Sequence, residues 1–177
     1  EFTPQIQYSY KITEDTSAYA SVGKSFTLPT MNDMYGQSNI IRNSDIRPEV
    51  GMHYETGLKH ISGDHSWKLA LFKSNVKDFI TNSENAQGEN VAINEDTKNM
   101  GVELSCEMNK AEGFSYNWGV SFSDPKYKTP KEDNGIWKRN YGRWLLNGGV
   151  SYSVSKFNIA LNASMMADRV LQKYQIP

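Results

Sequence analysis

The segment from Asp124 to Gly142, together with Arg143, combines cationic and aromatic side chains in a pattern suited to binding an anion. Guanidinium and ammonium groups donate hydrogen bonds to anionic oxygens, and aromatic rings stack on planar groups or on cations. The cations are Lys126, Lys128, Lys131, Lys138, Arg139 and Arg143, and the rings are Tyr127, Trp137 and Tyr141. We predict ligand contacts from Tyr127, Trp137, Arg139, Tyr141 and Arg143. A solvated loop with an aromatic residue at its base stays open as the alternative.

A second long segment, 27–47, holds further candidates for ligand contact. These are Tyr35 and Arg42, with Met31 and Met34 beside them. We predict that they are weaker candidates for ligand contact than the residues of the first set.

The chain lacks the residue patterns of the common catalytic sites. It contains no Gly-x-Ser-x-Gly, no His-Glu-x-x-His and no phosphate-binding loop. His60 and His65 flank a short turn, where two histidines indicate a plain surface more often than a metal site. The single cysteine, Cys106, excludes an internal disulfide and a cysteine-based zinc site. We predict no enzymatic activity, no metal site and no cofactor.

Composition narrows the class of protein. The 19 Lys and Arg residues balance 20 Asp and Glu residues, so nucleic acid is a poor partner. A 12% aromatic content and a net charge of −1 indicate a folded chain. The longest apolar run is the four residues Leu69 to Phe72, and a transmembrane helix needs about 20.

Period-two alternation predicts an all-β fold. From Phe114 to Ser123, aromatic and β-branched residues occupy one parity while Ser, Asn and Gly occupy the other. The predicted strands are 6–12, 17–26, 49–59, 66–80, 102–108, 114–123, 143–154 and 157–165. In the fourth strand the parity shifts at Phe72, which a β-bulge would explain. No segment has a convincing amphipathic helical pattern.

The connections between these strands alternate between short and long. The long ones are 27–47, 81–90 and 124–142. In an antiparallel meander every second connection lies at the same end, so one end has tight turns and the other has long loops. Outer-membrane barrels have this asymmetry, and their lumen suits the Ser- and Asn-rich parity. A soluble β-sandwich or a lipocalin-like barrel stays open as the alternative.

The same parity assigns side chains to two faces of the predicted barrel. Those expected to face lipid are Tyr54, Leu58, Trp118, Val120, Ile159 and Leu161, with Cys106 as a small member of that face. Those expected to face the lumen are Glu55, Lys59, Asn117 and Asn162. If the short turns are periplasmic, both ends of the chain lie on the extracellular side. That placement predicts a segment of a larger barrel.

Two stretches resemble the family of TonB-dependent outer-membrane receptors. The first is Ser17 to Tyr35, which resembles the family's Tyr-Ala-Ser-x-Gly-x-x-Phe followed by x-x-Pro-Thr-x-x-Glu-Leu-Tyr. The second is Ile46 to Lys59, which resembles the family's Leu-Lys-Pro-Glu followed by Tyr-Glu-x-Gly-Leu-Lys. The matching motif residues are Phe26, Pro29, Tyr35, Pro48, Glu49, Tyr54, Glu55 and Gly57. The chain departs from the family with Asp33-Met34 in place of Glu-Leu.

The resemblance implies an antiparallel up-and-down transmembrane β-barrel of roughly 22 strands, of which this chain is about eight. Residues 1–177 then form part of the C-terminal half of the barrel domain, and the plug domain is absent. The implied function is TonB-dependent uptake of a ferric siderophore or a similar scarce nutrient across the outer membrane of a Gram-negative-type bacterium. The implied partners are the TonB complex, reached through the plug, and outer-membrane lipid. The alternatives are a self-contained eight-stranded barrel acting as an adhesin or structural protein, and a soluble β-rich binding domain.

Overall fold

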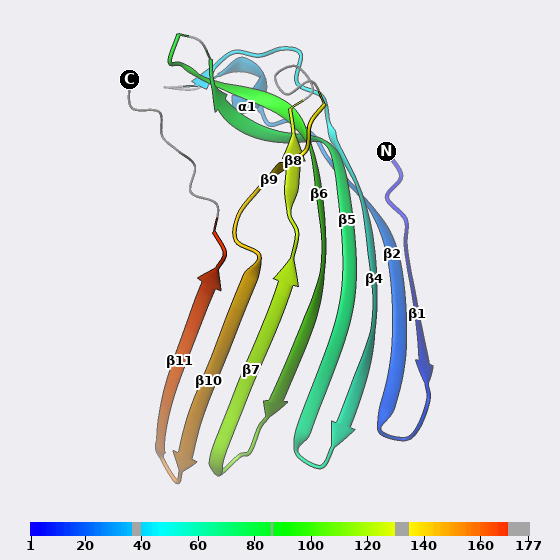
Figure 1. Cartoon of the computed structure of the whole chain (residues 1–177), viewed down its shortest axis with the longest axis vertical. Helices are drawn as coiled ribbons and strands as arrows, with labels where there is room; N and C mark the ends of the chain where they lie inside the picture. Colours follow the sequence, from blue (N-terminus) through cyan, green and yellow to red (C-terminus); the bar gives the residue numbers. More distant parts are fainter. Residues whose placement is uncertain (37–39, 86, 130–134, 170–177) are drawn as a thin grey trace.

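A computed structural model of the chain describes residues 1–36, 40–85, 87–129 and 135–169. Eight long strands make up most of this part (Figure 1). They are β1 (Gln5–Lys11), β2 (Thr16–Thr27), β4 (Glu49–Ser62), β5 (His65–Glu84), β6 (Asn90–Met108), β7 (Gly113–Ser123), β10 (Trp144–Val154) and β11 (Phe157–Ala167). Three short strands, β3 (Ile40–Ile41), β8 (Lys126–Lys128) and β9 (Lys138–Arg139), and the helix α1 (Met31–Tyr35) complete it. None of the described residues belongs to a helix long and apolar enough to cross a membrane.

The long strands form a single antiparallel meander. Their order is β1-β2-β4-β5-β6-β7-β10-β11, and each strand pairs with the next long strand along the chain. In Figure 1 the tight turns lie at the bottom, and the long connections lie at the top with α1, β8 and β9. Within the described residues β1 and β11 are the two edges of the sheet. The predicted all-β, up-and-down fold is confirmed.

The register places the two sequence parities on opposite faces of the sheet. Leu58, Leu69, Leu104, Val120 and Leu146 stand directly opposite one another in neighbouring strands. Opposed residues share a face, so this row and those parallel to it form a continuous apolar face. Many of its side chains are exposed. Tyr54, Leu58, Trp118, Val120, Ile159 and Leu161 lie on this apolar face, and Glu55, Lys59, Asn117 and Asn162 lie on the opposite, polar face, as predicted.

Aromatic side chains pack against one another across the apolar face. The rings of Trp67 and Trp118 meet edge to face with centroids 5.7 Å apart. Cys106 stands opposite both in the strand between them and is only 1% exposed. Cys106 therefore lies on the apolar face, as predicted, but it is covered by its neighbours. At the long-loop end of this face, Phe122 packs against Trp144 at 4.8 Å.

On the polar face, two glycines make room for aromatic rings that lie against the sheet. A Cβ at Gly57 would come within 2.7 Å of the Tyr19 ring and 2.3 Å of the Leu69 carbonyl oxygen. A Cβ at Gly101 would come within 2.6 Å of the Phe72 ring. The Tyr19 hydroxyl donates to Glu55 Oε1 at 2.5 Å. The motif residues Glu55 and Gly57 thus position Tyr19, one by a hydrogen bond and one by the absence of a side chain.

The structure corrects two predictions for β5 and β6. The predicted loop 81–90 is wrong, because β5 continues to Glu84 and β6 starts at Asn90. The predicted bulge at Phe72 is also wrong, since the register shifts later, between Val76 and Phe79. Phe72 points to the polar face, where its ring lies over Gly101. A bulky residue at this position therefore requires no shift in the strand register.

The helix α1 was not predicted. It begins with a capping box, in which Thr30 Oγ1 accepts from the Asp33 amide and the Asp33 carboxylate accepts from the Thr30 amide. These reciprocal bonds satisfy donors that a first helical turn leaves unpaired. The Thr-x-x-Asp spacing is the sequence signal that identifies this turn, although five residues are too few to show a helical period.

Candidate functional site

The β5–β6 hairpin organises the long-loop end of the molecule (Figure 1). One edge of β6 pairs with β5 along its whole length. Its other edge pairs in turn with β7 over 101–108, with β8 over 96–98 and with β3 over 90–91. Both long loops are therefore fastened to the same strand.

Neutral hydrogen bonds to the backbone hold the first loop, 28–48, against this hairpin. Asn43 Nδ2 donates to the Ala92 carbonyl oxygen at 2.8 Å. The Arg47 amide donates to Asn94 Oδ1 at 2.8 Å, and Asn94 Nδ2 donates back to the Arg47 carbonyl at 2.9 Å. Asn94 Nδ2 also lies 2.7 Å from the carbonyl oxygen of Asp78.

The motif residues at the end of this loop join it to the β5 bulge. The Glu49 carboxylate accepts from the Ile80 amide at 2.8 Å. The Arg47 guanidinium pairs with Asp78 at 2.6 Å. Asp78 has a φ of 57°, in the left-handed region that a non-glycine residue rarely adopts. The Arg47-Pro48-Glu49 motif thus supports an irregular backbone with one ion pair and one hydrogen bond.

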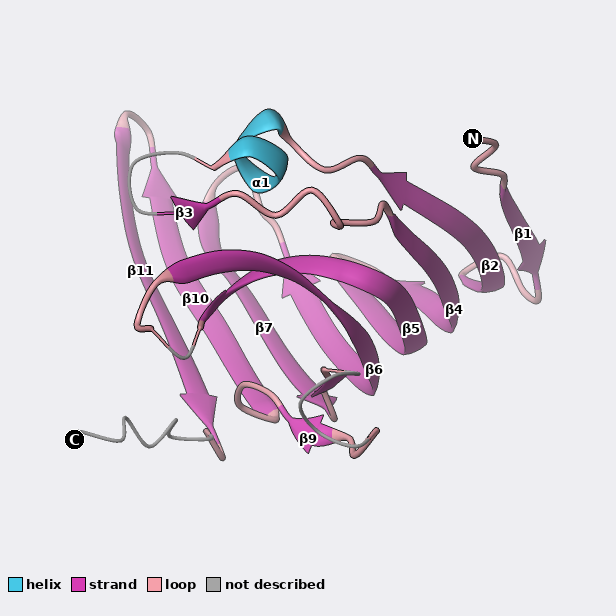
Figure 2. Cartoon of the chain, turned by 90° about the horizontal axis from the view of Figure 1, so that it is seen from above, coloured by secondary structure: helices cyan, strands magenta, loops and turns pink. Residues whose placement is uncertain are grey.

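The predicted ligand residues of the first loop contact each other. The Arg42 guanidinium carbon lies 5.8 Å from the centre of the Tyr35 ring. In the view of Figure 2, α1 and β3 lie on one side of the β5–β6 hairpin and β9 lies on the other. The structure therefore does not bring Tyr35 and Arg42 together with the aromatic residues of the second loop.

The second loop, 124–143, contains a hairpin whose register divides the predicted ligand residues between two sides. Tyr127 of β8 stands opposite Thr97 of β6 and opposite Lys138 of β9, so these three share the polar-face side. Lys126 stands opposite Lys98 and Arg139, which share the apolar-face side.

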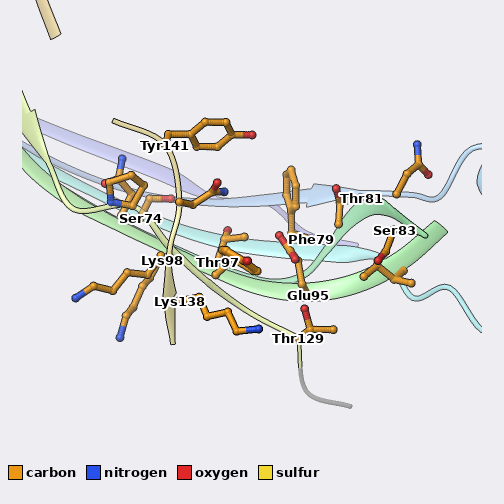
Figure 3. Close-up of a pocket in the computed structure, with 17 residues that line it drawn as sticks. Ser74, Phe79, Thr81, Ser83, Glu95, Thr97, Lys98, Thr129, Lys138 and Tyr141 are labelled. Carbon is orange, nitrogen blue, oxygen red and sulfur yellow. The ribbon is translucent and has the colours of Figure 1, made fainter. Parts of the chain in front are cut away.

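A cavity of about 470 Å³ lies on the polar-face side of this hairpin (Figure 3). We call it the polar-face pocket. β5 and β6 supply Ser74, Phe79, Thr81, Asn82, Ser83, Ile93, Glu95, Thr97, Lys98 and Asn99, and the second loop supplies Pro125, Lys126, Tyr127, Thr129, Lys138, Asn140 and Tyr141. Hydroxyls and amides predominate in this lining, with aromatic rings from both sides. The Asn99 side-chain oxygen is buried, and no donor among the described residues reaches it.

Trp137 belongs to the other side of the hairpin. The Lys98 ammonium lies 3.9 Å from the centre of its ring, and the Lys128 ammonium lies 5.1 Å away. Two cations over one indole hold the ring by cation–π attraction. Trp137 lines a second hollow of about 410 Å³ rather than the polar-face pocket.

Several of the predicted cations of the second loop are paired with carboxylates, while Lys131 lies outside the described residues. Arg139 lies 2.7 Å from Asp168, and Arg143 lies 2.9 Å from Asp124. Lys126 lies 2.6 Å from Asp124 as well. The hydrogen bond from Lys126, together with that from Arg143, holds the pKa of the Asp124 carboxyl below its usual value. These pairs lower the positive charge that the loop presents to a ligand.

Of the predicted contact residues, the polar-face pocket gathers Tyr127 and Tyr141. A smaller hollow next to it is lined by the same two tyrosines and by Arg139. Sequence reasoning missed Phe79, Thr97 and Asn99, although Thr97 and Asn99 continue the polar parity of β6 beyond Gly101. Extending that alternation into residues 91–101, which the predicted strands did not include, would have identified Thr97 and Asn99.

Comparison with known proteins identifies the family. The family model described as TonB dependent receptor-like, beta-barrel matches residues 1–173. The match covers nearly the whole chain, including the motif residues and the second loop.

Solved structures show the same fold. The siderophore receptor PirA from Pseudomonas aeruginosa is 13% identical, with a TM-score of 0.70 over 95% of this chain and 31% of that protein. The copper transporter OprC is 17% identical, with a TM-score of 0.66 over 92% of this chain and 26% of that protein. The FrpB iron transporter from Neisseria meningitidis is 19% identical, with a TM-score of 0.62 over 90% of this chain and 25% of that protein. This chain thus spans between 25% and 31% of the length of these proteins. From its strand order, its motif residues and the family match, the chain belongs to the TonB-dependent receptor-like β-barrel family.

Proposed function

We propose that this chain is part of the barrel of an outer-membrane receptor that takes up a ferric siderophore or a similar scarce nutrient in a TonB-dependent manner. The family match supports the class of protein. The observation that carries the proposal is the polar-face pocket, which lies where the second loop meets the β5–β6 hairpin. In an outer-membrane barrel the long loops are extracellular, so this pocket opens toward the nutrient.

The pocket lining suits a ligand with many oxygen atoms. Tyr127, Tyr141 and Phe79 offer rings for planar groups, and the amide of Asn99 and the hydroxyl of Thr97 offer polar contacts. Ferric chelates expose oxygen atoms beside planar or apolar groups. We therefore propose Tyr127 and Tyr141 as ligand contacts, with Arg139 at the margin of the site.

The proposed assembly places residues 1–177 in the barrel domain. Its proposed partners are outer-membrane lipid against the apolar face and the TonB complex, which acts through a plug domain. The two unjoined edges, β1 and β11, favour a section of a larger barrel over a self-contained eight-stranded one. The exposed apolar face disfavours the soluble alternative.

Uptake measured on cells that carry the complete receptor tests this proposal. Cells are given radiolabelled ferric hydroxamate, ferric catecholate or copper, with and without an uncoupler that collapses the energy supply. We expect energy-dependent accumulation of at least one of these substrates. Equal accumulation in cells with and without the receptor, for every substrate, would refute the function.

A pair of variants in the same receptor tests the site. Tyr127→Ala with Tyr141→Ala removes two rings from the pocket, each worth about 1 kcal/mol, so binding should weaken by about 25-fold. Trp137→Ala is the matched control, because its ring lies on the other side of the hairpin. If Trp137→Ala alone lost binding, the ligand would bind on the Trp137 side of the hairpin rather than in the polar-face pocket.

A further inference from the structure

Charged side chains on the apolar face are confined to its long-loop end. In the described strands this face carries no Asp, Glu, Lys or Arg from the short turns up to the level of Leu71. Lys73 stands in the next row, opposite Tyr54 and Met100. The row above contains Lys98 and Lys24. A predominantly apolar surface without Asp, Glu, Lys or Arg therefore ends at a border of lysines.

The hollow that contains Trp137 lies at this border, and we call it the rim groove. It has a volume of about 410 Å³ and is lined chiefly by Lys73, Asn75, Lys98, Met100, Lys126 and Trp137. Met100 lies at the lower end of the groove and is 57% exposed. It stands one row above Val102, which pairs with Phe122 in the neighbouring strand. The groove is thus continuous with the apolar face below it.

The charges of the rim groove are predominantly positive. Lys126 is paired with Asp124, and Lys98 lies over the Trp137 ring. Among the described residues Lys73 has no carboxylate within ion-pairing distance. Three ammonium groups and one carboxylate among the described residues of this groove give it a net positive charge, which suits an anion.

We propose that the rim groove binds the phosphate headgroup of an anionic lipid whose acyl chains lie on the apolar face. This inference rests on the membrane placement in the proposed function. Lysines and a tryptophan at the edge of an apolar surface match the level at which lipid headgroups lie. Basic clusters at that level attract anionic lipids. A free phosphate would gain nothing from Met100 and the apolar face, whereas a lipid gains contacts with both.

The rim groove differs from the polar-face pocket in position and in chemistry. Lys98, Asn99 and Lys126 line both hollows, whereas Lys73, Met100 and Trp137 line the rim groove and not the polar-face pocket. Lys73 and Met100 occupy apolar-face positions, while pocket residues such as Ser74 and Thr97 occupy polar-face positions. The residues that are not shared allow the two sites to be tested separately.

Native mass spectrometry of the complete receptor, extracted from membranes in mild detergent, tests the inference. The probes are phosphatidylglycerol and phosphatidylcholine with identical acyl chains. We expect retention of phosphatidylglycerol over phosphatidylcholine. Lys73→Gln with Lys98→Gln should weaken phosphatidylglycerol binding about fivefold for each lysine removed, or about 25-fold in total.

The matched control is Lys11→Gln with Lys156→Gln, which removes the same charge at the short-turn end. We expect it to retain phosphatidylglycerol as the unmodified receptor does. Equal retention in both double variants, or displacement of the lipid by inorganic phosphate at low millimolar concentration, would overturn the inference. Recovery of the unmodified receptor outside the outer-membrane fraction would instead overturn the membrane placement, and with it the proposed function.

Discussion

The wall of the sheet, from the short turns up to the row of Lys73, differs from the crown above it, which comprises 28–48, 74–99 and 124–143. In the wall, uninterrupted backbone pairing determines where each side chain points, so Trp118 and Asn117 differ in environment only through their parity. In the crown, side chains themselves hold the backbone. Asn94 binds main-chain groups of Arg47, the Ile80 amide is bound by Glu49 from the start of β4, and Asp124 binds two cations. The wall therefore tolerates changes that respect its faces, while the crown depends on individual residues.

The crown itself uses two kinds of contact. The first loop is held largely by neutral hydrogen bonds from Asn43 and Asn94. The second is held by a short antiparallel hairpin and by ion pairs of Asp124 and Asp168. Because salt and protons weaken ion pairs more than amide hydrogen bonds, the loop beside the polar-face pocket should be the more responsive to conditions.

The largest expected effect is in the wall. Trp118→Arg places a charge on the apolar face midway between the aromatic residues Phe114 and Phe122. Such a charge costs about 2–4 kcal/mol at mid-membrane. We expect the amount of complete receptor in the outer membrane, measured by immunoblot, to fall sharply. Asn117→Arg is the control on the polar face, and equal amounts of the two variants would contradict the assignment of faces.

The next effect tests the neutral anchor of the first loop. Asn94→Ala removes three hydrogen bonds to the backbone of Arg47 and Asp78. At about 1 kcal/mol each, the loop should open about 2–3 kcal/mol more easily. Amide hydrogen exchange over 43–49 should accelerate accordingly. Asn158→Ala, which removes one bond to Ser153 at the short-turn end, should leave that exchange unchanged.

A smaller effect is expected at the ionic anchor of the second loop. Asp124→Asn removes the charge that pairs with Lys126 and Arg143, and exposed pairs of this kind contribute about 1 kcal/mol. Exchange over 124–129 should accelerate several-fold. Raising the salt concentration from about 0.05 M to about 1 M should accelerate it in the unmodified receptor but not in Asp124→Asn. An equal salt response over 43–49 would remove the distinction between the loops.

The smallest expected effect is a response to pH. Lys126 and Arg143 lower the pKa of the Asp124 carboxyl below its usual 3.8. The ion pairs of Asp124 therefore stabilise the second loop fully above pH 3.8, and this stabilisation is lost as the pH falls through the lower pKa of the folded state. A spin label at Ile136→Cys reports on this loop, since Cys106 is buried. Label mobility should stay constant from about pH 7 to about pH 5 and rise only below about pH 4. The same rise in Asp124→Asn would assign the response to another group.

Much of the wall was predictable from the sequence. The alternation around Trp118 predicts a strand, and a one-residue slip would move Trp118 to the polar face, so the pattern also specifies the register. The sequence predicted a β-bulge at the wrong place, because a bulky residue appears at Phe72 on the polar parity. Phe72 is bulky because its ring fills the space above Gly101, and the register does not shift there. No local pattern in β5 reports that space.

The crown could be predicted only in part. The aromatic and cationic composition of 124–143 predicted ligand contacts from this segment, and the segment lines the polar-face pocket through Tyr127 and Tyr141. The carboxylates that pair with its arginines were not considered, because Asp168 is distant from Arg139 in sequence and close only in the folded chain.

The sequence by itself determined the strands, their meander order and the two faces of the wall, because period-two alternation is a local property that pairing preserves. Only the tertiary structure decided how the second loop is divided. Tyr127 faces the pocket because β8 pairs with β6, which places it opposite Thr97. Trp137 lies on the other side because Lys98 and Lys128, at apolar-face positions of the same two strands, bind its ring. The physical reason is that strand pairing between distant segments, rather than local composition, determines which face a loop residue joins.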